Sequence, residues 1–409
     1  MNKKQAWLIL SATMLISLLG TAGIALPYPV LAPYFLDSPP NSLNQFMGIN
    51  PKLLLGFALA LYPLGILIGS SFIGALSDHY GRRKVLLITL AGSTAGYLFT
   101  AYAVIEESYS LFLIGRLVTG ICEGNIAIAR AMAVELHPVI NRTKALSMVY
   151  ATVYSGWLLG PLAGGYLMIL GTEQVFIWAA IALAVCAAVV AIAIKDSNKQ
   201  KLTRGSIFQA IIDENSFRLL KHKEVRPIFT FYFIYALGNN TFYEFYPVWF
   251  VEIHQFTSDK IAWITVIMTG SMVLSSIFIT SAIVKYFGNL KSLTTSVFVL
   301  GILMMLQPFL GLDSIYFFFA VIGFLIALNN AVTPTYMSER FGGYGQGKVM
   351  GLQTSIFCLT NVIVAILGSV IAVLSIQATM IMAGLLVLSS FVWFLLFTRK
   401  TLEVKKQTV

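Results

Sequence analysis

Twelve long apolar runs constrain this chain more than any other feature of its sequence. Each holds about 20 or more mostly apolar residues, the length that an α-helix needs to cross the hydrocarbon core of a membrane. Charged residues make up only 11% of the 409 residues, against about 25% in a soluble domain. The chain lacks the polar side chains to cover a water-facing surface, so we predict an all-α integral membrane protein. The predicted spans are 7–34, 53–76, 85–105, 111–135, 144–170, 174–195, 226–251, 261–284, 292–310, 315–337, 348–374 and 376–398.

The basic residues are distributed unevenly about these spans. Twelve spans place both termini on one side, and 23 of the 27 Lys and Arg residues fall in the loops and tails of that side. Lys52 and Lys260 fall in the opposite loops, while Arg116 and Arg130 lie within the fourth span. Basic residues that flank spans stay cytoplasmic, so we predict that both termini face the cytoplasm. The net charge of +10 is then a topology signal and not a surface for nucleic acid.

The longest polar stretch lies near the middle of the chain and separates six spans from six. It predicts an N-terminal six-helix bundle at 1–195, a cytoplasmic linker at 196–225, and a C-terminal bundle with a cytoplasmic tail at 226–409. A rough apolar stripe within the linker fits a short amphipathic helix on the inner membrane face. A packed linker helix fits the same stripe equally well.

The two halves carry a related loop. A shift of 207 residues aligns Gly81 with Gly288 and Lys84 with Lys291, and it is close to half the chain length. We therefore predict that the two six-span halves are structural repeats. Repeats of this kind place a substrate site near the middle of the membrane, at the interface between the halves.

Three motifs point to a known family. The loop from Gly74 to Lys84 reads GALSDHYGRRK and matches G-x-L-[SD]-D-x-x-G-R-[RK]-[RK], so the whole chain resembles the major facilitator superfamily. Arg116-x-x-x-Gly120 resembles the arginine motif of its fourth span. The fifth span resembles the antiporter motif of the drug:proton antiporters, through Gly156, Gly160, Pro161, Gly164 and Gly165.

The chain departs from the family pattern in two places. In the second copy of the loop, Lys285 stands where the pattern has an acid and Asn289 where it has an arginine. Many relatives carry an acid in the first span, whereas this chain has none between Gln5 and Leu36. The second departure puts the usual assignment of the proton site in doubt.

The resemblance implies two six-helix pseudo-symmetric halves around a central cavity. It also implies that the charged turn from Asp78 to Lys84 holds the inner face closed. In the family, the acid of this turn contacts the start of span eleven, and its arginines contact an acid at the inner end of span four. The predicted gating residues are Asp78, Gly81, Arg82, Arg83 and Glu135. The alternative is that the basic residues only anchor topology, although anchoring requires neither Asp78 nor Gly81. The glycines of span five by themselves show only close helix packing.

Polar groups inside the spans are the candidate site. A charge near the membrane centre costs at least about 2.5–3.5 kcal/mol and normally faces water or a partner. Arg116, Glu123 and Arg130 recur every seven residues and so form one stripe. We predict Glu123 as the proton carrier and Glu244 as the second candidate; the alternative is a permanent ion pair of Glu123 with either arginine. The predicted substrate-binding residues are Arg116, Arg130, Asn125, Asn239, Asn240, Tyr243, Asn329, Asn330 and Tyr28.

No signal for catalysis or for a bound cofactor accompanies these groups. The four His residues show no metal-ligand spacing, the three Cys residues lie singly in apolar runs, and neither a P-loop nor a nucleophile motif occurs. We therefore predict no catalytic residue, no metal and no cofactor, with a proton gradient as the energy source. A proton that enters across about 100 mV supplies about 2.3 kcal/mol.

These observations predict a secondary active transporter that exports a small amphipathic or drug-like molecule in exchange for protons by alternating access. Two arginines on the stripe leave open export of an anionic metabolite or a siderophore-like chelator. A non-transporting membrane receptor is the remote alternative, because it needs neither the paired loops nor the charges within spans. The expected partners are the substrate, protons and membrane lipids, and the expected form is a monomer in a bacterial inner membrane.

Overall fold

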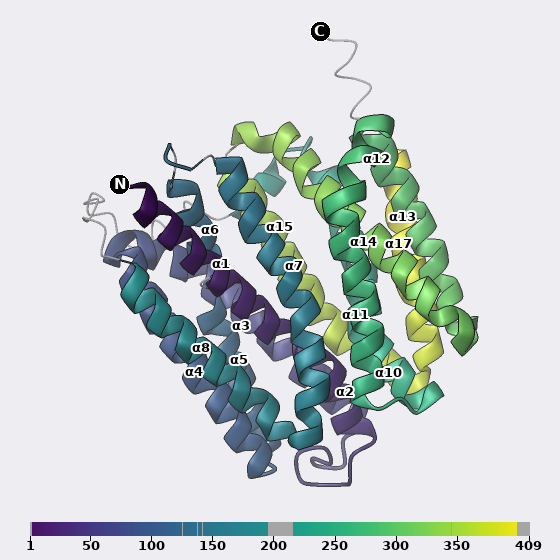
Figure 1. The fold of residues 1–409 in the computed structure, drawn as a ribbon. Helices are drawn as coiled ribbons and strands as arrows, with labels where there is room; N and C mark the ends of the chain where they lie inside the picture. Colours follow the sequence, from purple (N-terminus) through teal and green to yellow (C-terminus); the bar gives the residue numbers. More distant parts are fainter. Residues whose placement is uncertain are drawn as a thin grey trace. The chain divides into compact units, whose positions relative to one another are not determined.

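The computed structural model describes residues 2–124, 126–136, 138–140, 142–194, 216–344 and 346–398. The described residues are almost entirely helical and contain no strand (Figure 1). Ten helical segments within them are long and apolar enough to cross a membrane. The two remaining predicted spans, the fourth and the seventh, carry most of the candidate site residues. Their polar side chains and, in the fourth span, an interruption of the helix keep them outside this set.

Two compact units form the chain: Met1–Asp213 with Phe256–Val266, and Glu214–Gln255 with Ile267–Val409. Most helices fall within one unit, and α11 is divided between them after Val266. The helices of the first unit are α1 (Lys3–Ala25), α2 (Tyr28–Leu36), α3 (Pro51–Tyr80), α4 (Arg82–Ile105), α5 (Tyr109–Glu123), α6 (Ile126–Glu135), α7 (Arg142–Leu167) and α8 (Thr172–Ala193). Those that follow are α10 (Arg226–His254), α11 (Ser258–Leu274), α12 (Thr280–Phe287), α13 (Asn289–Leu306), α14 (Leu312–Phe341), α15 (Gln346–Ile363), α16 (Ser369–Leu374) and α17 (Ile376–Trp393).

Corresponding helices pack in the same pairs within each unit. In the first unit α4 packs on α8 and on α5, and α1 packs on α7 and α8. In the second unit α13 packs on α17 and on α14, and α10 packs on α15 and α17. Figure 1 shows α4 and α8 side by side along their length. The shared pairing is what a structural repeat of six spans requires.

Several predicted spans are interrupted where the backbone cannot continue a regular helix. The first span divides into α1 and α2 at Leu26 and Pro27, because Pro27 and Pro29 supply no backbone N–H to the helix ladder. The eighth span passes from α11 through a π-helical turn at Ser275–Ile279 into α12. A second π-helical turn, at Val364–Gly368, joins α15 to α16.

The fourth span is also divided, at Gly124. α5 ends at Glu123 with Gly124 as its C-cap, and α6 begins at Ile126. Gly124 lies against the backbone of α3, where an added Cβ would approach the amide nitrogen of Ser70 to 2.7 Å. The prediction that Arg116, Glu123 and Arg130 form one stripe stays a prediction, because the side chain of Arg130 lies outside the described part of the chain.

The linker prediction falls mostly outside the described residues. Of the stretch 196–225, the structure describes 216–225. A short 3₁₀ helix, η2 (Ser216–Lys221), occupies the start of this part and packs against α15 of the second unit.

Candidate functional site

A buried cluster around Glu123 is the centre of the candidate site in the first unit. Arg116 is 3% exposed and Glu123 2% exposed, both on α5. Tyr62 of α3 contacts both: its hydroxyl donates a hydrogen bond to Oε2 of Glu123, and its ring faces Arg116, whose Cζ lies 4.3 Å from the ring centroid. Tyr62 thus links the two charged groups, which are two helical turns apart on the same face.

Two further elements close this cluster. An added Cβ at Gly23 of α1 would lie 2.7 Å from the hydroxyl of Tyr97 on α4 and 3.6 Å from Oε1 of Glu123. Gly23 therefore leaves the space in which these two oxygen atoms sit. Tyr97 is fully buried and lies near enough to Arg116 to interact with it electrostatically. Four helices, α1, α3, α4 and α5, thus surround one carboxyl group and one guanidinium.

Unused hydrogen-bonding capacity remains in the cluster. Among the described residues, Oε1 of Glu123, the hydroxyl of Tyr97, and Nε and Nη1 of Arg116 have no hydrogen-bond partner. No described guanidinium forms an ion pair with Glu123. The alternative of a permanent Arg116–Glu123 ion pair is therefore not what the structure shows.

Two predicted members of this site fall outside the described part of the chain. Asn125 is among the residues that the structure does not describe, and so is the side chain of Arg130. Their predicted roles in substrate binding stay predictions. The predicted pair between Glu123 and Arg130 stays a prediction for the same reason.

The second unit contains a separate set of buried polar groups on α10. Glu244 is 4% exposed, Asn239 6% and Asn240 2%. Asn240 donates from Nδ2 to Oγ1 of Thr360 on α15 at 2.9 Å, which fixes its position. Oε2 of Glu244 and Oδ1 of Asn239 have no hydrogen-bond partner among the described residues. Glu244 is therefore buried within the second unit.

The remaining predicted binding residues differ in their surroundings. Asn329 of α14 is fully buried and accepts a hydrogen bond at Oδ1 from Oγ of Ser296 at 2.6 Å. Its neighbour Asn330 is exposed. The hydroxyl of Tyr243 lies 3.2 Å from Sδ of Met272, and the ring of Tyr28 lies 5.6 Å from that of Trp157. The structure thus ties Asn329 into a helix contact and leaves Asn330 accessible.

The gating turn of the first unit forms at Gly81. Its backbone has φ 97° and ψ 139°, a conformation that a residue with a Cβ adopts only at a cost. Immediately after it, Arg82 contacts Glu135 at the end of α6: Nη2 and Nε lie 2.7 and 3.2 Å from Oε1. Nη1 of Arg82 also donates to Oγ of Ser77 at 2.8 Å. The turn is therefore tied to the end of the fourth span by a charge-assisted contact.

The other gating residues have different partners. Arg83 donates from Nη2 to the carbonyl oxygen of Ala191 at 2.9 Å, near the end of α8, where backbone carbonyls lack helical partners. The expectation that both arginines reach an acid on span four therefore holds for the contact of Arg82, whereas Arg83 binds the end of span six. The side chain of Asp78 lies outside the described part of the chain.

The second unit repeats the turn with less charge. Gly288 has φ 79° and ψ 160°, close to the conformation of Gly81. After it, Nδ2 of Asn289 donates to Oε2 of Glu339 on α14 at 3.2 Å. This contact occupies the place that Arg82 and Glu135 occupy in the first unit, with an amide in place of a guanidinium.

The glycine face of α7 lies directly on the first span. A Cβ added at Gly156 would lie 2.7 Å from the carbonyl oxygen of Leu18, and one added at Gly160 would lie 2.5 Å from that of Ala22. A Cβ added at Gly164 would meet the carbonyl oxygen of Leu26. The helix continues through Pro161. Gly165 faces another neighbour, because a Cβ there would meet Ala262 of α11. These residues show close packing, while a part in antiport remains a prediction.

Sequence reasoning missed three features of this site. Tyr62 and Tyr97 were not identified, although each is a phenol within an apolar run. A close contact between α3 and α5 was also missed. It is formed by Gly65 and Gly69 of α3 with Gly120 of α5 and its C-cap Gly124, and a Cβ added at any of these glycines would touch backbone atoms of the facing segment. The four-residue spacing on both helices was the available signal.

Comparison with known families identifies the class of protein that this chain resembles. The family model described as Major Facilitator Superfamily matches residues 9–257 and 228–408. The structure is similar to the crystal structure of the human organic anion transporter MFSD10 (TETRAN), with a TM-score of 0.69, 17% identity, and coverage of 95% of this chain and 99% of that one. It is also similar to the crystal structure of the POT family transporter PepTSo, with a TM-score of 0.73 and 11% identity. That similarity covers 98% of this chain and 99% of that one.

Sequence relatives are named for drug resistance. The tetracycline resistance protein, class H, of Pasteurella multocida is 32% identical over 169 residues, which are 41% of this chain and 40% of that relative. The chain thus matches less than half the length of this relative. The quinolone resistance protein NorA of Staphylococcus aureus (strain MSSA476) is 24% identical over 95% of this chain and 96% of that relative. The multidrug resistance protein 2 of Bacillus subtilis (strain 168) is 23% identical over 94% of this chain and 92% of that relative.

Proposed function

This chain belongs to the Major Facilitator Superfamily, and from that premise we propose that it exports small amphipathic, drug-like molecules in exchange for protons. Relatives along most of the chain are named for resistance to quinolones or to multiple drugs, which supports this class of cargo. The asymmetry of basic residues supports an orientation with both termini in the cytoplasm. The bacterial relatives support a place in a bacterial inner membrane.

The observation that carries the proposal is the environment of Glu123. This carboxyl group is buried within a membrane helix, bonded at one oxygen by the neutral hydroxyl of Tyr62, and paired with no described cation. A buried carboxyl group of this kind marks a proton pathway in a membrane protein. These surroundings support a role in which Glu123 takes up a proton and gives it up when water, a cation or the cargo reaches its second oxygen.

Arg116 gives this carboxyl group a nearby charge that can act on it. The guanidinium is held over the ring of Tyr62 and not against the carboxylate. A change in the position of Tyr62 would act on both groups at once, because its ring contacts one and its hydroxyl the other. We therefore assign Tyr62 the role of linking proton binding at Glu123 to the position of Arg116.

Glu244 is the second proton-binding candidate. It is buried in its own unit and lacks a hydrogen-bond partner at Oε2 among the described residues. Asn239 and Asn240 lie one to two helical turns before it on α10. We propose that these amides bind polar groups of a cargo, together with the predicted binding residues of α14.

Export of an anionic molecule is the second candidate function. The specific observation that favours it is Arg116, whose Nε and Nη1 have no hydrogen-bond partner among the described residues although the side chain is 3% exposed. Such N–H groups suit a carboxylate. The two candidates predict opposite charge preferences.

The test is substrate flux in proteoliposomes with an imposed pH gradient. Wild type, Glu123→Gln and Glu106→Gln are compared with a fluorescent lipophilic cation and with a fluorescent carboxylate as cargo. The proposal expects gradient-driven flux of the cation in wild type and in the exposed-site control Glu106→Gln, and loss of the gradient dependence in Glu123→Gln. Gradient-driven flux that survives Glu123→Gln removes Glu123 from coupling, and flux of the carboxylate alone selects the anionic candidate.

A further inference from the structure

A partly exposed groove in the first unit is lined by residues other than those of the cluster around Glu123. It has a volume of about 410 Å³ and is bounded by the last part of α3, the first part of α4 and the end of α5. Its lining residues are Phe72, Ile73, Leu76, Tyr80, Lys84, Val85, Ile88, Thr89, Ile121 and Cys122. The volume lies within the range of about 300–1,000 Å³ found for small-molecule sites. No part of the proposed transport mechanism uses this groove.

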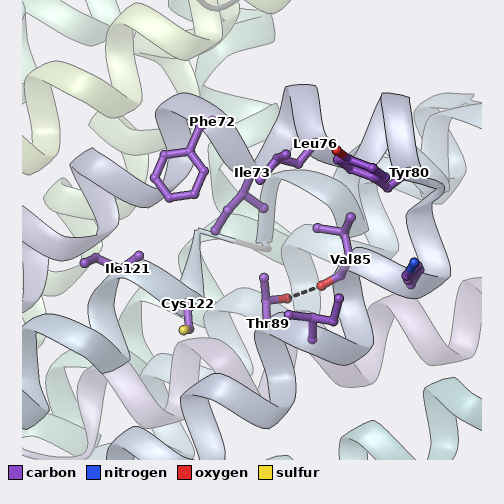
Figure 2. A pocket seen from close by; sticks show the side chains of 10 residues that line it. Phe72, Ile73, Leu76, Tyr80, Val85, Thr89, Ile121 and Cys122 are labelled. Carbon is purple, nitrogen blue, oxygen red and sulfur yellow. Dashed lines mark hydrogen bonds between the residues drawn. The ribbon is translucent and has the colours of Figure 1, made fainter. Parts of the chain in front are cut away.

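The wall of the groove is apolar along most of its length. Ile73 and Val85 are buried at its base, and Ile88 is 61% exposed at its edge. The one hydroxyl in the middle, that of Thr89, donates to the carbonyl oxygen of Val85 at 2.9 Å, drawn as the dashed line in Figure 2. Because that hydroxyl is satisfied by its own helix, the wall offers an apolar surface to an occupant.

The two ends of the groove differ. Figure 2 shows Phe72, Ile121 and Cys122 toward one end and Tyr80 at the other. Tyr80 is 48% exposed, and Lys84 follows it across the Gly81 turn, also exposed. One end therefore carries a cation and a phenol, and the other only apolar groups and a thiol.

The length of the groove matches half a membrane. Phe72 and Tyr80 are eight residues apart on α3, which corresponds to about 12 Å along the helix. One leaflet of a hydrocarbon core about 30 Å thick is about 15 Å deep. A groove that begins at the charged turn therefore runs through most of one leaflet, the cytoplasmic one in the proposed orientation.

We propose that this groove binds one anionic phospholipid of the cytoplasmic leaflet, with an acyl chain along α3 and α4 and the phosphate at Lys84 and Tyr80. Charge selects this occupant, because a lysine at the mouth attracts a phosphate and repels a lipophilic cation. A basic residue near an anionic membrane surface contributes attraction that a zwitterionic lipid does not match. The occupant contacts both helices that flank Gly81.

The first experiment measures retained lipid by native mass spectrometry of the full-length protein. Phosphatidylglycerol and phosphatidylcholine with identical chains are the probes, and the variants are Lys84→Gln and Lys291→Gln. Lys291 is the matched control because it holds the equivalent position after Gly288 in the other repeat. Wild type and Lys291→Gln should retain phosphatidylglycerol in preference to phosphatidylcholine, and Lys84→Gln should bind it about fivefold less tightly, which equals about 1 kcal/mol. Equal losses in the two variants would overturn the proposal.

A second measurement needs no variant. Cys122 lines the groove and is partly exposed, whereas Cys186 and Cys358 are 0% and 3% exposed. Alkylation of wild-type protein in detergent by a small maleimide, read by peptide mass spectrometry, should be slower at Cys122 with added phosphatidylglycerol than with phosphatidylcholine. Equal rates with the two lipids, or protection by the fluorescent lipophilic cation in place of phosphatidylglycerol, would refute the lipid site. Either result leaves the proton-coupling test at Glu123 unaffected.

Discussion

The packing of α7 on α1 makes a prediction whose size can be derived from the structure. Gly160→Ala would place a Cβ 2.5 Å from the carbonyl oxygen of Ala22 and 3.0 Å from Cβ of Ala25. Ordinary contact begins near 3.4 Å, so the helices must separate by about 0.9 Å because neither obstacle is a flexible side chain. Overpacking of this kind costs about 1–3 kcal/mol. We expect Gly160→Ala to lower the free energy of unfolding, despite the gain of up to about 1 kcal/mol that alanine brings to a helix.

Gly270 provides the matched control for this substitution. It lies within α11, and an added Cβ would meet no atom within 4 Å. Gly270→Ala should therefore keep the helical gain and raise the unfolding temperature, whereas Gly160→Ala lowers it. The measurement is thermal unfolding of both purified variants and wild type in one detergent. If Gly160→Ala is as stable as Gly270→Ala, the reasoning from rigid backbone contact is wrong.

Three further predictions concern the gating turn and the buried cluster. In a double-mutant cycle of Arg82→Gln and Glu135→Gln, thermal unfolding should give a coupling free energy between the two side chains of about 0.2–1 kcal/mol, because the pair is partly exposed. A coupling free energy above that range would contradict the exposure of the pair. Gly81→Ala should lower the unfolding free energy by about 1–3 kcal/mol through backbone strain at positive φ, measured against wild type, and an unchanged value would contradict the strained turn. Tyr62→Phe should reduce gradient-driven flux in proteoliposomes more than Tyr97→Phe, because only Tyr62 bonds Glu123 in the structure; equal effects of the two substitutions would remove the special role of Tyr62.

The features that could be predicted from sequence are those that a single helix or turn determines. The length and apolarity of each run depend on local composition, which is why ten segments met the criteria for spans. The glycine spacing of α7 fixed one face of that helix, and the structure places that face on α1. Gly81 and Gly288 were aligned by the shift of 207 residues, and both adopt positive φ. In each case the residue type restricts the backbone before any distant contact forms.

The features that could not be predicted depend on contacts between distant segments. Nothing in the run around Tyr62 indicates that its hydroxyl meets Glu123, which is 61 residues away. The seven-residue spacing of Arg116 and Glu123 correctly places them on one face of α5, but spacing does not decide whether two charges two turns apart bond each other or a third group. The ring of Tyr62 occupies the position beside the guanidinium.

The turns at Gly81 and Gly288 have similar backbone conformations and different electrostatics, and this difference bears on how an alternating transporter can work. A transporter needs contacts that close one side firmly enough to exclude leakage and weakly enough to open in every cycle. In the first unit the turn is held by a guanidinium on a carboxylate, with side chains 20% and 55% exposed, where solvent limits an ion pair to about 0.2–1 kcal/mol. In the second unit an amide replaces the guanidinium at 3.2 Å from Glu339. Both contacts fall in the weak range that opening requires, whereas the buried charged side chains among the described residues are Arg116, Glu123 and Glu244. The strongest electrostatic effects therefore lie at the residues that we propose for cargo and proton binding, while the surface turns supply only small differences between conformations.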